Sequence, residues 1–197
     1  MILDLHTHSV KSDDGRAKVE NYCKWIQKKE LPLDGFVLTE HRQFDDQSDY
    51  RPLEDAYGLT IMKASEVETD YGHVLVFGVN DDLLNAFDFT NVRLPIEMVL
   101  EESSKAGAFA APCHPGRKRV GLFAHYEEKG PIQGVHTVET LNGGSIPGED
   151  ELSSTWRKPW AIEVSEEATV TSSAALVIAQ LIFPTRGLTI SVNSSVR

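Results

Sequence analysis

The sequence predicts an α/β fold in which parallel strands alternate with helices, and three observations lead to this expectation. Short apolar runs typical of buried strands recur between segments whose apolar residues follow helical spacing. Histidine or glutamate stands at the end of most of these runs. A hydrophobic content of 41% and a charged content of 25% are ordinary for a globular protein. In such folds the loops after the strands build the functional site, so we expect one there.

The expected elements follow one another through the first three quarters of the chain. Apolar runs predict six strands, at residues 2–5, 35–39, 59–63, 73–79, 108–111 and 135–138. Apolar stripes at helical spacing predict two helices, at residues 16–30 and 95–106. Leu31-Pro32 ends the first helix, and Gly107 is a suitable cap for the second.

Composition disfavours several classes of function. The net charge of −11 argues against a broad electrostatic grip on nucleic acid or on an anionic membrane, although it does not exclude a small anionic substrate. The two cysteines, Cys23 and Cys113, are far apart, which favours a reducing compartment and no disulfide framework. No signal peptide or apolar run long enough for a membrane span is expected, so the predicted location is cytoplasmic.

The ends of the predicted strands carry the residue types that bind metal ions. His6 and His8 lie two residues apart, so in an extended chain both rings point to the same side. The full set of candidate ligands is His6, His8, Asp13, His41, Glu66, His73 and His114. Such a set suits divalent Zn, Mn, Fe or Mg without choosing among them. His73 opens its strand, so we expect a tight return after Glu66 to bring it to the others.

Two other polar residues near these ligands, Arg117 and Glu40, allow two interpretations each. Arg117, in the run Arg117-Lys118-Arg119, belongs either to a solvated loop or to a clamp that binds a phosphate group of the substrate. Glu40 either orients a neighbouring ligand or shuttles a proton. Cys113 is expected to be buried packing rather than a nucleophile. His125 and His136 are expected to be structural or exposed.

Five ordered motifs, which span about residues 1 to 150, resemble the PHP (polymerase and histidinol phosphatase) family. They are Asp4-Leu-His6-Thr-His8-Ser9 with Ser12-Asp13, Thr39-Glu40-His41, Glu66 with Gly72-His73-Val-Leu, Ala111-Pro-Cys-His114-Pro-Gly, and Val138-Glu-Thr-Leu-Asn-Gly143. The resemblance implies a distorted seven-stranded (β/α) barrel, a site for up to three ions, and phosphoesterase activity.

The resemblance also implies a distribution of ligands. His6, His8 and Glu66 would hold one ion; Glu66, His73 and His114 would hold a second; Asp13 and His41 would help to hold a third. Glu66 would therefore bridge two ions, since a carboxylate has two oxygens.

The chain departs from this family after residue 152. A Gly-Ser-Asp-x-His motif, which closes the site in the family, is absent, and no histidine follows His136. We therefore divide the chain into a PHP-like metal-binding domain, 1–152, and an atypical tail, 153–197. In a shifted reading frame, the codons of residues 165–171 can read Gly-Gly-Ser-Asp-Ser-His, so a frameshift is one explanation and a divergent native ending is the other. An incomplete barrel, fewer than three ions, poor metal retention and weak turnover are expected.

The predicted function is hydrolysis of a phosphate ester by a metal-activated water at a multinuclear site. The substrate class is a small phosphorylated molecule or a nucleotide, with nucleic acid disfavoured but not excluded. The alternative is a catalytically silent metal-binding or interaction protein. A third reading is a hydrolase that acts on a substrate without phosphate.

Overall fold

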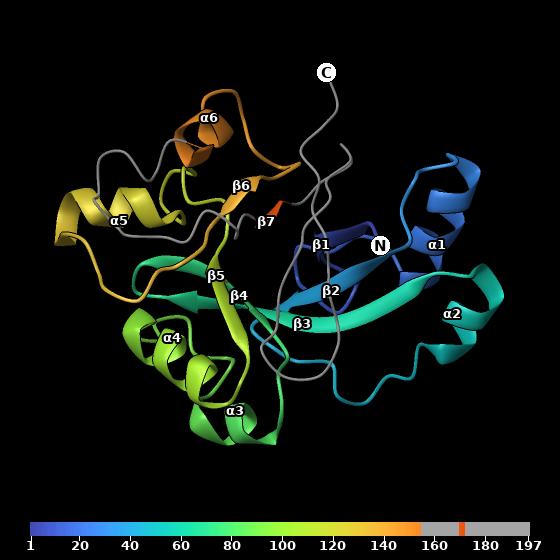
Figure 1. Cartoon of the computed structure of the whole chain (residues 1–197), viewed down its shortest axis with the longest axis horizontal. Coiled ribbons are helices and arrows are strands. Elements are labelled where there is room, and N and C mark those ends of the chain that lie inside the picture. Colours follow the sequence, from blue (N-terminus) through green and yellow to red (C-terminus); the bar gives the residue numbers. More distant parts are fainter. Residues whose placement is uncertain (155–169, 172–197) are drawn as a thin grey trace.

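The computed structural model describes residues 1–154 and 170–171 (Figure 1). The strands are β1 Leu3–Thr7, β2 Gly35–His41, β3 Thr60–Thr69, β4 Gly72–Phe77, β5 Phe109–Pro112, β6 Glu139–Leu141 and β7 Val170–Thr171. The helices are α1 Val19–Lys28, α2 Arg51–Tyr57, α3 Asp81–Ala86, α4 Ile96–Lys105, α5 Leu122–Lys129 and α6 Glu149–Ser154. The first five predicted strands and both predicted helices are present with shifted ends.

The seven-stranded (β/α) barrel predicted from the family resemblance is wrong for the described residues. They form an open, mixed five-stranded sheet in the order β1-β2-β3-β4-β5, and β6 pairs separately with β7. β1, β2 and β3 are parallel, but β4 runs antiparallel to both of its neighbours. The arrangement is a partial barrel with helices around the outside of the sheet (Figure 1).

The short turn between β3 and β4 explains why the all-parallel prediction failed. A parallel crossover needs a dozen residues or more, whereas only Asp70 and Tyr71 separate these strands. The predicted strand at 135–138 was also wrong. Val135 and Val138 are buried in the core against the helices, and the strand begins one residue later, at Glu139.

The two faces of the sheet carry different cores, as the period of two along a strand requires. In β2, Phe36 and Leu38 pack against Cys23 of α1, whereas Val37 faces the opposite side of the sheet. β4 alternates in the same way between residues that pack on the helices and residues that face inward. The inner face is the one that carries the polar cluster described below.

An irregularity in β1 turns His6, and His8 just after the strand, toward this inner face. Leu3 pairs with Gly35, but Thr7 pairs with Leu38, so the register shifts by one residue between Asp4 and Thr7. Leu38 packs on α1, and Thr7 beside it takes the same outer side. His6 and His8 alternate with Thr7 and therefore point inward.

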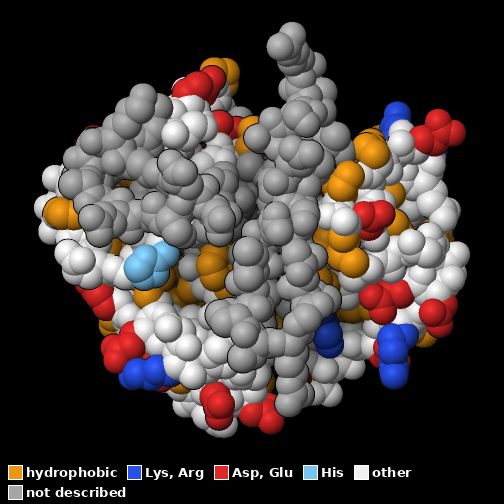
Figure 2. Space-filling view, viewed as in Figure 1, with side chains coloured by type: hydrophobic (Ala, Val, Ile, Leu, Met, Phe, Trp, Pro, Cys, Tyr) orange, Lys and Arg blue, Asp and Glu red, His pale blue; other side chains and the backbone are white. Residues whose placement is uncertain are grey.

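Charged side chains are spread over the surface. On the face shown in Figure 2, acidic and basic side chains of the described residues are scattered, and no broad basic patch is visible among them. None of the helices in the described part of the chain is long and apolar enough to cross a membrane. The predicted cytoplasmic location stays a prediction.

The predicted tail lies almost entirely outside the described residues. Of residues 153–197, the structure describes 153–154, in α6, and 170–171, which form β7. The domain boundary at residue 152 and the frameshift explanation therefore stay predictions.

Candidate metal centre

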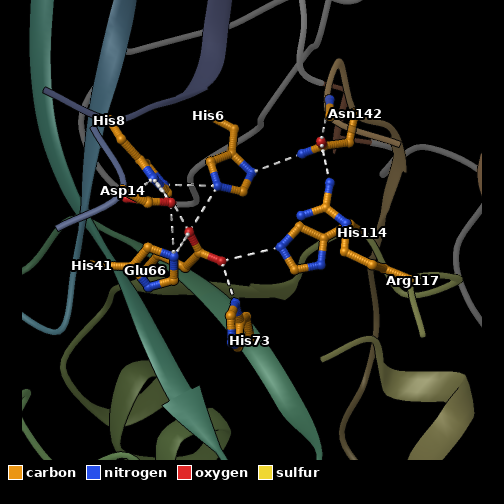
Figure 3. Close-up of a pocket in the computed structure, with 10 residues that line it drawn as sticks. His6, His8, Asp14, His41, Glu66, His73, His114, Arg117 and Asn142 are labelled. Carbon is orange, nitrogen blue, oxygen red and sulfur yellow. Dashed lines mark hydrogen bonds and ion pairs between the residues drawn. The ribbon is translucent and has the colours of Figure 1, made fainter. Parts of the chain in front are cut away.

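Five imidazole rings surround the buried carboxylate of Glu66 (Figure 3). Glu66 Oε2 lies 2.9 Å from His6 Nε2, 2.8 Å from His8 Nε2 and 3.2 Å from His41 Nε2. Glu66 Oε1 lies 2.8 Å from His73 Nδ1 and 3.1 Å from His114 Nε2. The structure thus brings together the five histidines and the glutamate that the sequence singled out.

Sheet register places three of these residues. His41 is the last residue of β2 and pairs with Glu66 in the parallel register, so both side chains lie on the same face. In the antiparallel pair, Glu66 lies opposite Leu75 and Glu68 lies opposite His73. His73 is therefore a diagonal neighbour of Glu66, close enough for contact. The tight return expected after Glu66 is confirmed.

His114 reaches the cluster through an unusual backbone conformation. It follows the end of β5, and its φ of 31° lies in the left-handed region that non-glycine residues seldom adopt. Its backbone N–H donates to Glu139 Oε2 at 2.7 Å, which helps to hold this conformation. Strain of this kind persists where the surrounding structure fixes the residue, and it often marks functional sites.

Asp14, rather than Asp13, lies beside the histidines. The Asp14 carboxylate lies 3.0 Å from His8 Nδ1 and 3.6 Å from His41 Nε2. The Asp13 carboxylate instead accepts a hydrogen bond from Arg42, which lowers the pKa of Asp13. Because the two residues are adjacent and chemically identical, the sequence alone could not choose between them.

The charges in the cluster depend on one another. Burial acts to raise the pKa of Glu66, but the positive charge of His6 and hydrogen bonds from His114 and His73 bring it well below its usual range. Burial acts to lower the pKa of His6, but the charges of Glu139 and Glu66 raise it well above 6.5. For His41 and His114, burial has the larger effect and lowers the pKa. The Glu66 carboxylate is thus stabilised by the charge of His6 and by hydrogen bonds from the surrounding rings.

The donor atoms fit divalent metal ions. Three groups of side chains have ligand atoms within 4.8 Å of one another: His6, Glu66, Cys113 and His114; His8, Asp14 and His41; and His41, Glu66 and His73. Two groups share Glu66, as a bridging carboxylate would require. The mixture of imidazole nitrogen and carboxylate oxygen suits zinc, manganese or iron.

Glu139 fixes the orientation of the His6 ring through the nitrogen that does not face Glu66. It is fully buried at the start of β6, and its Oε1 lies 3.0 Å from His6 Nδ1. A carboxylate in contact with Nδ1 keeps the proton on that nitrogen, which leaves Nε2 available as a ligand. An acidic residue at the end of an apolar run is the sequence signal that could have identified it.

Glu40 and Cys113 have structural contacts. Glu40 is fully buried and accepts hydrogen bonds from Ser9 N and from the Ser12 hydroxyl, which in turn accepts from His41 N. It therefore fixes the loop that leads to Asp14, which favours the orienting role over the proton shuttle. The Cys113 thiol donates to Glu66 Oε1 at 3.2 Å, and burial raises the pKa of Cys113 well above its usual range, as expected for a residue that is no nucleophile.

A cavity of about 330 Å³ opens over the cluster. Its lining combines the cluster with the guanidinium of Arg117 and with Asn142 and Gly144, which follow β6. The Arg117 guanidinium donates to Asn142 Oδ1 at 2.8 Å, and Figure 3 shows Asn142 between Arg117 and His6. A cavity of this size suits a small ligand.

His125 and His136 do not belong to the cluster. His125 contacts the Arg119 carbonyl, and His136 is exposed.

No family model and no curated protein matches the sequence. Among solved structures, similar folds are found in a candidate metal-dependent phosphoesterase from Bifidobacterium adolescentis (TM-score 0.58, 15% identity, 87% of this chain and 86% of that chain covered). PsfC from Pseudomonas syringae is also similar (TM-score 0.56, 18% identity, 88% and 75% covered). A third is an amidohydrolase from Chromobacterium violaceum with bound sulfate and no metal (TM-score 0.60, 13% identity, 87% and 87% covered). At these identities the similarity concerns the fold.

Proposed function

We propose that this chain is a metal-dependent phosphoesterase related to the PHP family. The observation that carries the proposal is the clustering of five imidazoles around the buried Glu66 at the floor of a cavity that also exposes an arginine. Two of the structures with a similar fold are described as a metal-dependent phosphoesterase and an amidohydrolase, which supports a metal-dependent hydrolase in general.

The proposed ligands follow the contacts in the cluster. The metal ligands are His6, His8, Asp14, His41, Glu66, His73 and His114, with Asp14 in the place that the sequence assigned to Asp13. Glu66 would be shared by two ions, because one of its oxygens faces His6, His8 and His41 and the other faces His73 and His114. The donor set would suit divalent Zn, Mn, Fe or Mg.

Divalent ions in such a site supply an activated water and neutralise charge on a phosphoryl group. The chain's own residues orient the reactants. The rigid strand ends fix the imidazoles, and Arg117 offers a guanidinium that matches phosphate oxygens. The cavity volume favours a small phosphorylated molecule or a single nucleotide over a nucleic-acid strand, in agreement with the net charge of −11.

Hydrolysis of an aryl phosphate by protein loaded with manganese tests the proposal. We expect turnover that depends on added metal and that falls below detection in Glu66→Gln and His8→Ala. Glu127→Gln, an exposed position on α5, is the matched control and should retain the wild-type rate. Metal binding without turnover of any phosphate ester would favour the silent metal-binding alternative, and turnover of a phosphate-free ester or amide would favour the third reading.

A further inference from the structure

Arg117 is held in place by the loop that follows β6. Its guanidinium donates to Asn142 Oδ1 at 2.8 Å. Gly144 covers the same group closely, since a Cβ at Gly144 would lie 3.0 Å from the Arg117 terminal nitrogen. A free arginine side chain samples many rotamers, so these contacts restrict Arg117 before any ligand binds.

The Asn142 side chain is itself held in one orientation. Its amide nitrogen donates to Glu139 Oε2 at 3.0 Å, and its amide oxygen accepts from Gly144 N at 2.9 Å as well as from Arg117. A flipped amide would place an oxygen against the carboxylate of Glu139 and an NH₂ group against the guanidinium. Both contacts would be repulsive, so the network fixes which atom faces Arg117.

Glu139 connects this arrangement to the metal centre. One of its oxygens contacts His6 Nδ1, and the other accepts from Asn142. The contacts therefore run without a break from His6 through Glu139 and Asn142 to Arg117. Figure 3 shows a second, direct route, in which Asn142 Nδ2 lies 3.3 Å from His6 Nδ1 and Asn142 Oδ1 accepts from Arg117.

We propose that Asn142 is a positioning residue that aims Arg117 at the phosphate-binding side of the metal centre, with Glu139 as its anchor. The inference rests on the proposed function, because it assigns Arg117 to the phosphoryl group. Asn142 itself acts through Arg117, and its amide need not contact the substrate. Loss of Asn142 leaves the guanidinium in the cavity but no longer fixed, so phosphate binding weakens while the metal ligands keep their places.

The test is a double-mutant cycle on manganese-loaded protein with inorganic phosphate as the probe. We measure the dissociation constant of phosphate by calorimetry for Arg117→Ala, Asn142→Ala and the double variant, and the manganese content of each. A lost hydrogen bond to a charged group corresponds to roughly a tenfold weakening. We expect that weakening in Asn142→Ala, unchanged manganese content, and a double variant no weaker than Arg117→Ala alone. Asn85→Ala, on α3, is the matched control and should bind phosphate normally.

Three results would overturn the inference: wild-type phosphate binding in Asn142→Ala, additive effects in the double variant, or loss of manganese from Asn142→Ala. Manganese-loaded wild-type protein that does not bind phosphate would overturn it as well. With aryl phosphate, the expected change is a higher KM in Asn142→Ala with kcat changed less. A protein that binds phosphate as expected but hydrolyses no phosphate ester would refute the proposed function and leave the positioning role of Asn142 standing.

Discussion

His73 Nδ1 lies 2.8 Å from Glu66 Oε1 because the turn at Asp70 and Tyr71 folds β4 back along β3. The pair joins the start of one strand to the middle of its neighbour, so one antiparallel hairpin supplies both a terminal and a central member of the cluster. This geometry makes Glu66 the common neighbour of residues from β1, β2, β4 and the end of β5.

Asp14 and Asp13 should differ sharply in their effect on metal binding. Asp14 contacts His8 and lies near His41, whereas Asp13 is bonded to Arg42 and is largely exposed. We expect Asp14→Ala to lose an ion or to bind it at least tenfold more weakly, since ligand loss is costly, while Asp13→Ala retains it. Metal content per chain after dialysis distinguishes the two variants. Equal losses of metal in both would contradict the assignment of Asp14, rather than Asp13, as the ligand.

Metal binding should release protons near neutral pH. Although burial acts to lower the pKa of His6, the charges of Glu139 and Glu66 raise it well above 6.5, so the metal-free ring keeps its second proton to a higher pH than a free imidazole does. A metal at Nε2 must displace that proton. Affinity should therefore increase as pH rises toward the raised pKa of His6 and level off above it. Calorimetry in buffers with different ionisation enthalpies measures the protons released; a pH-independent affinity from pH 6 upward, with no release, would count against this assignment.

Removal of the buried Glu139 carboxylate should weaken metal binding without removing a ligand. In Glu139→Gln the side-chain amide can present a donor to His6 Nδ1, which favours the wrong tautomer of the ring. Loss of such a supporting contact typically weakens metal binding about 10- to 100-fold. Metal titration checks this, with the exposed Glu97→Gln as control, and nitrogen chemical shifts of the His6 ring report the tautomer directly. An unchanged tautomer would remove the basis of the prediction.

Glu40→Ala should destabilise the fold more than a surface substitution does. The change leaves the backbone N–H of Ser9 and the hydroxyl of Ser12 buried without their acceptor. We expect a loss of about 2–3 kcal/mol in the free energy of unfolding, as is usual for buried donors that lose a charged partner. Urea denaturation of the metal-free protein measures it. Glu101→Ala, at an exposed position on α4, should cause little change, and comparable losses in the two variants would contradict the structural role of Glu40.

The candidate site was predictable from the sequence to the extent that ligands lie where apolar runs end. His6, His8, His41 and His114 lie at or just after the end of a strand, and the side-by-side strands then bring them together. Glu66 instead lies inside β3, which continues to Thr69. The choice between Asp13 and Asp14 depends on the path of a loop, which residue pattern does not determine. The contact from Glu139 to His6 joins residues 133 positions apart, and the sequence pattern does not predict contacts between such distant residues either.

The fold was less predictable than the site. Apolar runs mark buried strands but do not reveal direction, so β4, which runs antiparallel to both of its neighbours, was expected to be parallel to them. α3 was not predicted because it is short, although the Asn80 side chain caps the helix by accepting a hydrogen bond from Leu83 N. The register shift in β1, which turns His6 and His8 inward, arises from pairing with β2 and has no local sequence signal.

Metal content per chain tests the central claim most directly. Wild-type protein and Glu66→Gln are incubated with manganese or zinc, freed of excess metal without chelators, and analysed by elemental mass spectrometry. We predict more than one ion per wild-type chain and a loss of the bound ions in Glu66→Gln, because the bridging carboxylate is shared by two of the groups of ligands. A wild-type chain that retains no ion with either metal, or a Glu66→Gln variant that retains as many as the wild type, would contradict the account.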